Sequence, residues 1–221
     1  MLRWIERFAV SSIGRKALMA VTGLMLVGFL FVHLAGNLTL YADSDGAAFD
    51  AYVEQIGSLP ILPLAEAGLA LLFVAHILLA IFTVRENRRA RPIGYQATGT
   101  HGRKNIASTT MLVSGVVLGL FLVKHLSDFR LKKATFEEAP YEMIVAAFSD
   151  GGTVAIYLLG AVALGFHLFH ALQSVAQTLG VNHPKYTPAI LWGGRVLAIV
   201  LALAFASFPL VLSILHGGSN Q

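Results

Sequence analysis

The sequence predicts an all-α integral membrane protein with five transmembrane helices. The chain has 221 residues, of which 56% are hydrophobic and only 13% charged, and its mean hydropathy is +0.71. A soluble domain carries about 25% charged residues, so the composition excludes a water-soluble single domain and a disordered chain. Five stretches reach the length of about 20 mostly apolar residues that crosses a bilayer.

The predicted spans are roughly 17–41, 61–84, 106–127, 153–177 and 190–214. The first could be mistaken for a signal peptide, but its apolar stretch is longer than about 15 residues and no A-x-A cleavage site follows it. We interpret it as a retained helix. The last span contains Pro209, where we expect a kink. We expect a single transmembrane domain over residues 1–221, without an internal repeat.

The positive charges predict the orientation of these spans. With the N-terminus inside, Lys and Arg divide 12 to 4 in favour of the inner side. Loops rich in Lys and Arg stay in the cytoplasm. The N-terminus is therefore predicted to be cytoplasmic and the C-terminus to lie outside.

Histidine is the main candidate for chemistry, because the chain has no cysteine and eight histidines. Without cysteine there are no disulfides, iron–sulfur ligands or c-type haem attachment. The first four spans all carry histidine: His33, His76, His125, and the pair His167 and His170. Ionisable side chains in lipid are costly and mark functional sites. Interhelical hydrogen bonding and a proton relay are the simpler alternatives. A proton relay usually uses Asp or Glu near the middle of the membrane, and Glu66 is the only acid inside a predicted span.

Depth in the membrane predicts how these histidines pair. With a rise of about 1.5 Å per residue, His33 and His125 lie about 10 and 5 Å from the outer helix ends. His76 and His167 lie about 13 and 15 Å from the inner ends. Two imidazoles in each of two layers would suit two bis-histidine b-type haems, stacked across a bilayer about 30 Å thick. By depth alone, His170 is as good an inner ligand as His167.

Several strings resemble the five-helix, di-haem cytochrome b anchor subunit of succinate dehydrogenase and quinol:fumarate reductase. These strings are SSIGRKALMAVTGLMLVGFLFVHLAGNL, AFDAYVEQIGSLPILPLAEAGLALLFVAH, FLVKHLSDF and GFHLFHALQSVAQTLGVNHPKY. The resemblance implies that the first four helices form a bundle around two stacked b haems. It makes His33 and His125 the distal ligands and His76 and His167 the proximal ligands. His170 falls where the family carries a non-ligating polar residue.

The resemblance also implies partners. The subunit would act in a bacterial cytoplasmic membrane only with a flavoprotein and an iron–sulfur protein, which dock on the cytoplasmic face. Those partners carry FAD, the iron–sulfur clusters and the dicarboxylate site, so this chain has no catalytic residue of its own. Electrons would pass through the two haems to or from a membrane quinone, with menaquinone expected. We expect membrane lipids as partners and no nucleic acid. The complex could also form a higher oligomer.

Two places are candidates for the quinone. On the outer side, Glu54 lies roughly where a related fumarate reductase has a functional carboxylate, and Glu66 lies deeper. On the inner side, Ser11 and Arg15 are one helical turn apart and suit a quinone carbonyl or a haem propionate. The simpler readings are a solvated loop acid for Glu54, a helix-dipole acid for Glu66 and a membrane anchor for Arg15. Lys124 and Arg130 are further candidates for pairing with outer propionates.

Two alternative functions remain open at this point. One is the haem b subunit of another membrane oxidoreductase, such as a hydrogenase or formate dehydrogenase. The other is a transporter that uses these histidines without haem.

Overall fold

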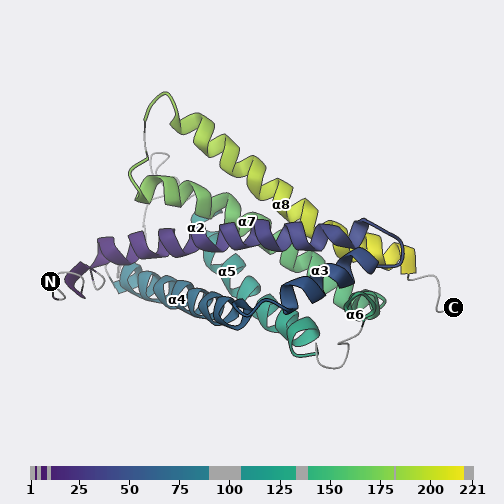
Figure 1. Ribbon diagram of the computed structural model, residues 1–221. Helices are drawn as coiled ribbons and strands as arrows, with labels where there is room; N and C mark the ends of the chain where they lie inside the picture. The colour runs from purple at the N-terminus through teal and green to yellow at the C-terminus, as the bar shows by residue number, and fades with distance from the viewer. Residues whose placement is uncertain are drawn as a thin grey trace.

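The computed structural model describes residues 3, 6–8, 11–89, 106–132, 139–181 and 183–216, and these residues form helices and turns without a strand. Five helices are long and apolar enough to cross a membrane, which confirms the predicted number (Figure 1). Their spans are Ser12–Tyr41, Leu62–Arg89, Thr110–Arg130, Gly151–Thr178 and Thr187–His216.

The long helices are α2 (Ser12–Asn37), α4 (Leu62–Arg89), α5 (Ile106–His125), α7 (Gly151–Thr178) and α8 (Thr187–His216). Two of them continue in another geometry. A short 3₁₀ turn, η1 (Leu38–Tyr41), follows α2, and a π-helical turn, η2 (Leu126–Arg130), follows α5. Most helices run a few residues past the predicted bounds, because the helical hydrogen bonds continue beyond the apolar segment.

Side-chain caps fix where two of the long helices begin. The Ser11 hydroxyl accepts a hydrogen bond from the Gly14 amide at 2.9 Å and starts α2. The Asp150 carboxylate accepts from the Thr153 amide at 2.7 Å and starts α7. Each cap satisfies an amide that has no partner within the helix, a contribution of about 1 kcal/mol.

Two short helices, α3 (Ala47–Gly57) and α6 (Pro140–Phe148), lie at the same end of the molecule as the end of α8 (Figure 1). Hydropathy does not predict them, because neither is long enough to cross a bilayer. The Tyr141 amide donates to Asp50 at 2.7 Å and joins the two helices. Gly46 precedes α3 with a φ of +79°, in the left-handed region that favours glycine. A Cβ at this position would also clash with the Tyr141 ring, so both the backbone conformation and the packing require glycine.

The long helices pack in neighbouring pairs. Helix α2 lies along α4, α5 along α7, and α7 along α8. The main apolar cluster lies at the end covered by α3 and α6. Its buried members are Leu40, Phe49, Tyr141, Ile144, Phe148, Tyr157, Phe208 and Leu212. A second cluster of Leu168, Ala198 and Leu201 joins α7 to α8. Helix α8 continues through Pro209, which is buried.

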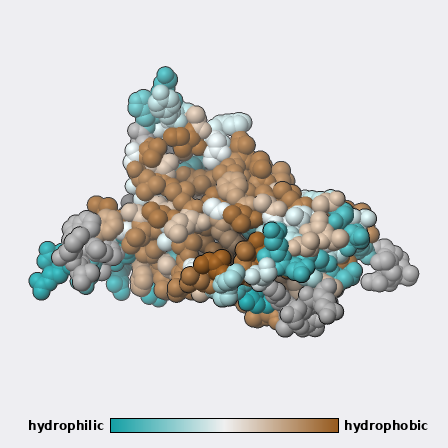
Figure 2. Space-filling model, in the orientation of Figure 1, coloured by the Kyte–Doolittle hydropathy of each residue, from teal (hydrophilic) through white to brown (hydrophobic). Residues whose placement is uncertain are grey.

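The outer surface of the long helices is largely apolar, and hydrophilic residues gather at the ends of the molecule (Figure 2). Within the spans, 33% of the apolar window of α7 is buried inside the chain, against 6% for α4 and 6% for α5. Helices α4 and α5 therefore leave most of their apolar surface for lipid or for other groups to cover.

Candidate functional site

The outer pair of histidines, His33 on α2 and His125 on α5, comes together as predicted from depth. The ring centroids are 5.7 Å apart and the ring planes are perpendicular. The two imidazoles therefore meet edge to face from two different helices.

The inner pair is His76 on α4 and His167 on α7. His170 is on α7 too, three residues after His167. The His76 Nδ1 atom lies 3.0 Å from the Thr22 hydroxyl on α2. The His167 Nδ1 atom lies 3.4 Å from the Ser114 hydroxyl on α5.

The number of ligands in each pair restricts what it can hold. Among the described residues, no group of three or more His, Cys, Asp or Glu side chains is arranged to hold a metal ion. Protein zinc sites use at least three protein ligands. Two imidazoles with no third ligand instead fit a metal whose remaining positions come from a macrocycle, as in haem. The residues present therefore fit b-type haem in both pairs.

Aromatic rings surround the outer pair. His33 stacks on Phe29 at a centroid distance of 5.3 Å and on Phe205 at 5.9 Å. His125 contacts three further rings, those of Phe121, Phe129 and Tyr157. The Nδ1 atom of His125 is buried and has no hydrogen-bond partner.

Glycine lies beside each histidine of the inner pair. A Cβ added to Gly23 would be 3.2 Å from Cε1 of His76, and one added to Gly115 would be 3.6 Å from Cε1 of His167. The contact at Gly23 is tighter than ordinary van der Waals contact, whereas the one at Gly115 is ordinary. Gly28 and Gly119 face open space within 4 Å, whereas a Cβ on Gly36 would meet the Tyr52 ring of α3.

A comparison of the helices around these pairs corrects our expectation that the chain has no internal repeat. Residues 19–34 of α2 align without gaps with residues 111–126 of α5, and half of these sixteen positions are identical. The identical positions are Met19/Met111, Val21/Val113, Gly23/Gly115, Leu26/Leu118, Phe29/Phe121, Leu30/Leu122, His33/His125 and Leu34/Leu126. Thr22 aligns with Ser114. Helices α2 and α5, which carry the outer pair, are therefore equivalent, and the matching contacts Thr22–His76 and Ser114–His167 place α4 and α7 in corresponding positions beside them.

The sequence alone did not lead us to Thr22, Ser114 and Gly23. The sequence does contain a signal, because the string Met-x-Val-Thr/Ser-Gly occurs in both helices. In each helix, the glycine of this string lies ten residues before the histidine. His170 stacks edge-on against Phe169, and its Nδ1 atom is buried without a partner.

A buried polar network that we did not predict supports the outer pair. Asp128 is 7% exposed and accepts hydrogen bonds from Lys124 at 2.5 Å and from the Tyr157 hydroxyl at 3.0 Å. It lies in the π-helical turn η2, directly after His125. Lys124 and Asp128 are four residues apart, the spacing that brings side chains together on a helix.

The four candidate quinone residues are separated by the structure. Glu54 is exposed on α3. Glu66, in α4, forms a two-point ion pair with Arg130 at 3.0 and 2.9 Å. At the other end, Arg15 pairs with Glu86 at 2.6 Å and keeps a buried Nε without a partner. The Ser11 hydroxyl is occupied in capping α2 and donates to the Phe8 carbonyl at 2.7 Å.

These ion pairs also involve the cations that we predicted for propionates. Lys124 and Arg130 each have a carboxylate partner within the chain. The basic residues Arg91, Arg103, Lys104 and Lys133 and the histidine His101 lie outside the described residues.

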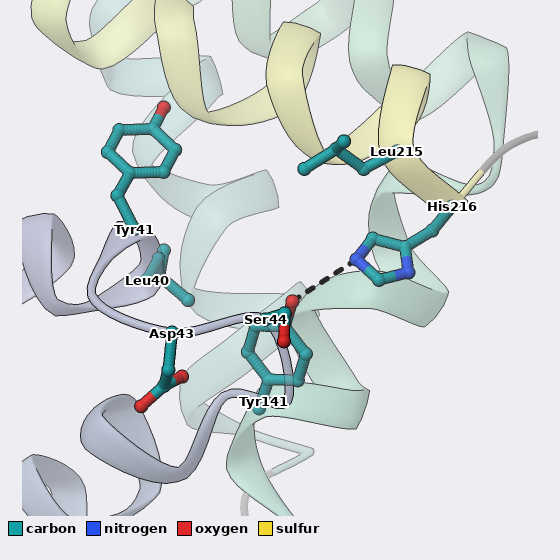
Figure 3. A pocket seen from close by; sticks show the side chains of 7 residues that line it. All are labelled: Leu40, Tyr41, Asp43, Ser44, Tyr141, Leu215 and His216. Atoms are coloured by element: carbon teal, nitrogen blue, oxygen red, sulfur yellow. Dashed lines mark hydrogen bonds between the residues drawn. The ribbon is translucent and has the colours of Figure 1, made fainter.

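A hollow of about 450 Å³ lies at the end covered by α3 and α6 (Figure 3). Its lining consists of Leu40, Tyr41, Asp43, Ser44, Tyr141, Leu215 and His216. The Tyr141 hydroxyl and Nε2 of His216 face each other at 3.1 Å. The Asp43 carboxylate accepts from the amides of Gly46 and Ala48, so it serves the start of α3. No residue predicted for haem or quinone lines this hollow.

Comparison of the chain with protein-family models, curated proteins and solved structures gave no match.

Proposed function

We propose that the chain is the membrane-anchor cytochrome b subunit of a succinate:quinone oxidoreductase, holding two b-type haems between paired histidines. The outer haem would be held by His33 and His125, and the inner haem by His76 and His167. The observations that carry the proposal are that His33 meets His125 across α2 and α5, and that His76 and His167 make matching hydroxyl contacts in the two halves. Among the described residues, no group of three or more His, Cys, Asp or Glu side chains completes a metal site.

A haem bound in each layer would supply one-electron transfer, which the protein side chains do not provide. The protein would position the two groups at different depths, so that electrons cross the apolar layer in two short steps. In the predicted orientation, the inner pair lies nearer the cytoplasmic face, where the flavoprotein and iron–sulfur subunits would dock. This chain would then exchange electrons with menaquinone and would bind no dicarboxylate.

The outer end offers proton acceptors for quinone chemistry, which couples two electrons to two protons. Glu54 is exposed and carries no ion pair among the described contacts. This availability favours it over Glu66, whose carboxylate is paired with Arg130 at both oxygens. We therefore propose Glu54 as the first of the four candidates to test.

The test is a reduced-minus-oxidised spectrum of the purified complex, recorded after addition of dithionite and, separately, of succinate or a menaquinol. The proposal predicts b-type bands that succinate or the quinol reduces in part. Absence of b-type bands in folded complex would favour the haem-free transporter. Bands that hydrogen or formate reduces and succinate does not would favour the other oxidoreductase class.

A further inference from the structure

The inner histidines share an environment that the outer histidines lack. A hydroxyl lies at the Nδ1 atom of each inner ring, 3.0 Å away for Thr22 and His76 and 3.4 Å away for Ser114 and His167. Both hydroxyls come from the neighbouring helix of the same half, α2 for His76 and α5 for His167. They occupy aligned positions in the internal repeat.

The direction of these hydrogen bonds follows from the other contacts of the hydroxyls. The Thr22 hydroxyl shares its one proton between the carbonyls of Leu18 and Met19, at 2.9 and 3.1 Å. The Ser114 hydroxyl donates to the Met111 carbonyl at 3.1 Å. A hydroxyl has one proton and two lone pairs, so towards each histidine it acts as an acceptor.

Because each hydroxyl acts as an acceptor, each ring presents an N–H group at this side. In a neutral imidazole with a proton on Nδ1, the lone pair is on Nε2. Nε2 is then the atom available to bind a metal.

Gly23 lets α2 approach His76 closely. Gly23 and Gly115 follow the hydroxyl residues directly, and a Cβ at Gly115 would be in ordinary contact with His167 at 3.6 Å. A Cβ at Gly23 would be 3.2 Å from His76, which is tighter than ordinary van der Waals contact.

We propose that Thr22 and Ser114 are positioning residues for the inner haem. They hold His76 and His167 in the tautomer with the proton on Nδ1 and direct Nε2 of both rings towards the iron. A ligand histidine that donates its other N–H to an acceptor becomes a stronger electron donor to the metal. The two hydroxyls therefore lower the reduction potential of the inner haem. This inference rests on the proposed haem function.

The test is a potentiometric titration of the intact complex carrying Thr22→Val, Ser114→Ala or both. The inner haem is assigned as the spectral component that is lost in His167→Ala. Each single variant should raise the potential of the inner haem, the double variant should raise it further, and the outer haem should stay unchanged. The conservative variants Thr22→Ser and Ser114→Thr should restore the wild-type potential.

Thr83→Val is the matched control for loss of a threonine hydroxyl from a span. Thr83 is buried on α4, and its hydroxyl donates to the Leu79 carbonyl at 2.8 Å and has no hydrogen bond to a histidine of the described residues. This variant should leave both potentials unchanged. Loss of the inner haem alone in Thr22→Val, restored in Thr22→Ser, would also support the proposal.

Two results would overturn the inference while leaving the haem function intact. One is that both haems are present and Thr22→Val and Ser114→Ala move neither potential. The other is that they move the inner and outer potentials equally, as a general loss of packing would. An absence of haem from the wild-type complex is a different result, which would overturn the proposed function itself.

Discussion

The outer and inner histidine pairs are built from equivalent helices of the two halves, yet their surroundings differ in kind. Around the outer pair the neighbours are aromatic rings, and His125 has an Nδ1 atom without a partner. Around the inner pair the neighbours at Nδ1 are hydroxyls on the adjacent helix. Shape and stacking orient the outer rings, whereas hydrogen bonds orient the inner rings.

The difference follows the position of each pair in the fold. The outer pair lies near the end covered by α3 and α6, where the main apolar cluster and its aromatic residues gather. The inner pair is remote from that cluster and faces Thr22–Gly23 and Ser114–Gly115. One internal repeat thus supplies both environments, with Phe29 and Phe121 for the outer histidines and the hydroxyl–glycine pairs for the inner ones.

The largest expected effect comes from removing single ligands. His33→Ala or His125→Ala should remove the outer haem and leave the inner one, and His76→Ala or His167→Ala should do the reverse. An iron that loses one of only two protein ligands is held by a single imidazole. The haem content of each purified variant shows how much haem is lost, and its spectrum identifies which of the two haem components has disappeared.

His170→Ala is the control for this series, because His170 lies beside His167 and is not proposed as a ligand. It should retain both haems. If His170→Ala removes a haem and His167→Ala retains both, the inner ligand is His170. If His33→Ala and His125→Ala remove different components, the two-layer arrangement is wrong.

An intermediate effect is expected at Asp128, in the buried network beside the outer pair. Asp128→Asn removes the charge that pairs with Lys124 and weakens the hydrogen bond from Tyr157. We expect a loss of about 2 kcal/mol in the free energy of unfolding, the usual cost of disrupting a buried charged hydrogen bond. Thermal unfolding in detergent measures it.

Glu66→Gln is the matched control, because the Arg130–Glu66 pair is also near this end but is exposed, with side chains 55% and 40% accessible. An exposed ion pair contributes about 1 kcal/mol or less. Equal losses in the two variants would mean that the network at Asp128 has no special part in supporting the outer pair.

The smallest expected effect is the pH dependence of the start of α7, the helix that carries His167. The Thr153 amide donates to Asp150, which lowers the pKa of this carboxyl below its ordinary value of 3.8. Because the folded state favours the carboxylate, the cap contributes fully above that value and is lost as pH falls through the lowered pKa.

Asp150→Asn tests this dependence, since asparagine also caps helices but does not titrate in this range. Between pH 6 and pH 3, the thermal midpoint of the wild type should fall more than that of Asp150→Asn. Parallel curves for the two proteins would show that this cap does not contribute to the acid sensitivity of α7.

The sequence was sufficient to predict the five spans, because hydropathy over 20 residues depends little on tertiary contacts. Depth, which follows directly from helical rise, also predicted that His33 lies beside His125. The sequence did not predict α3 and α6, which are short and are stabilised by contacts such as the Tyr141 amide with Asp50.

The hydroxyl contacts were harder to predict for a different reason. Thr22 and His76 are 54 positions apart on different helices, and Ser114 and His167 are 53 apart. Which helix faces which is decided by packing, and sequence spacing carries no information on it. Only the internal repeat marks Thr22 and Ser114 as equivalent, and it becomes informative once the facing histidines are known.

The ratio of haem to chain in the purified wild-type complex tests the central claim most directly. Extraction of the haem as its pyridine derivative, with the chain quantified by amino-acid analysis, gives this ratio without assumptions about potentials. Two histidine pairs that each hold one haem predict two b haems for each chain. A ratio of one, or no haem in a folded complex, would contradict the account.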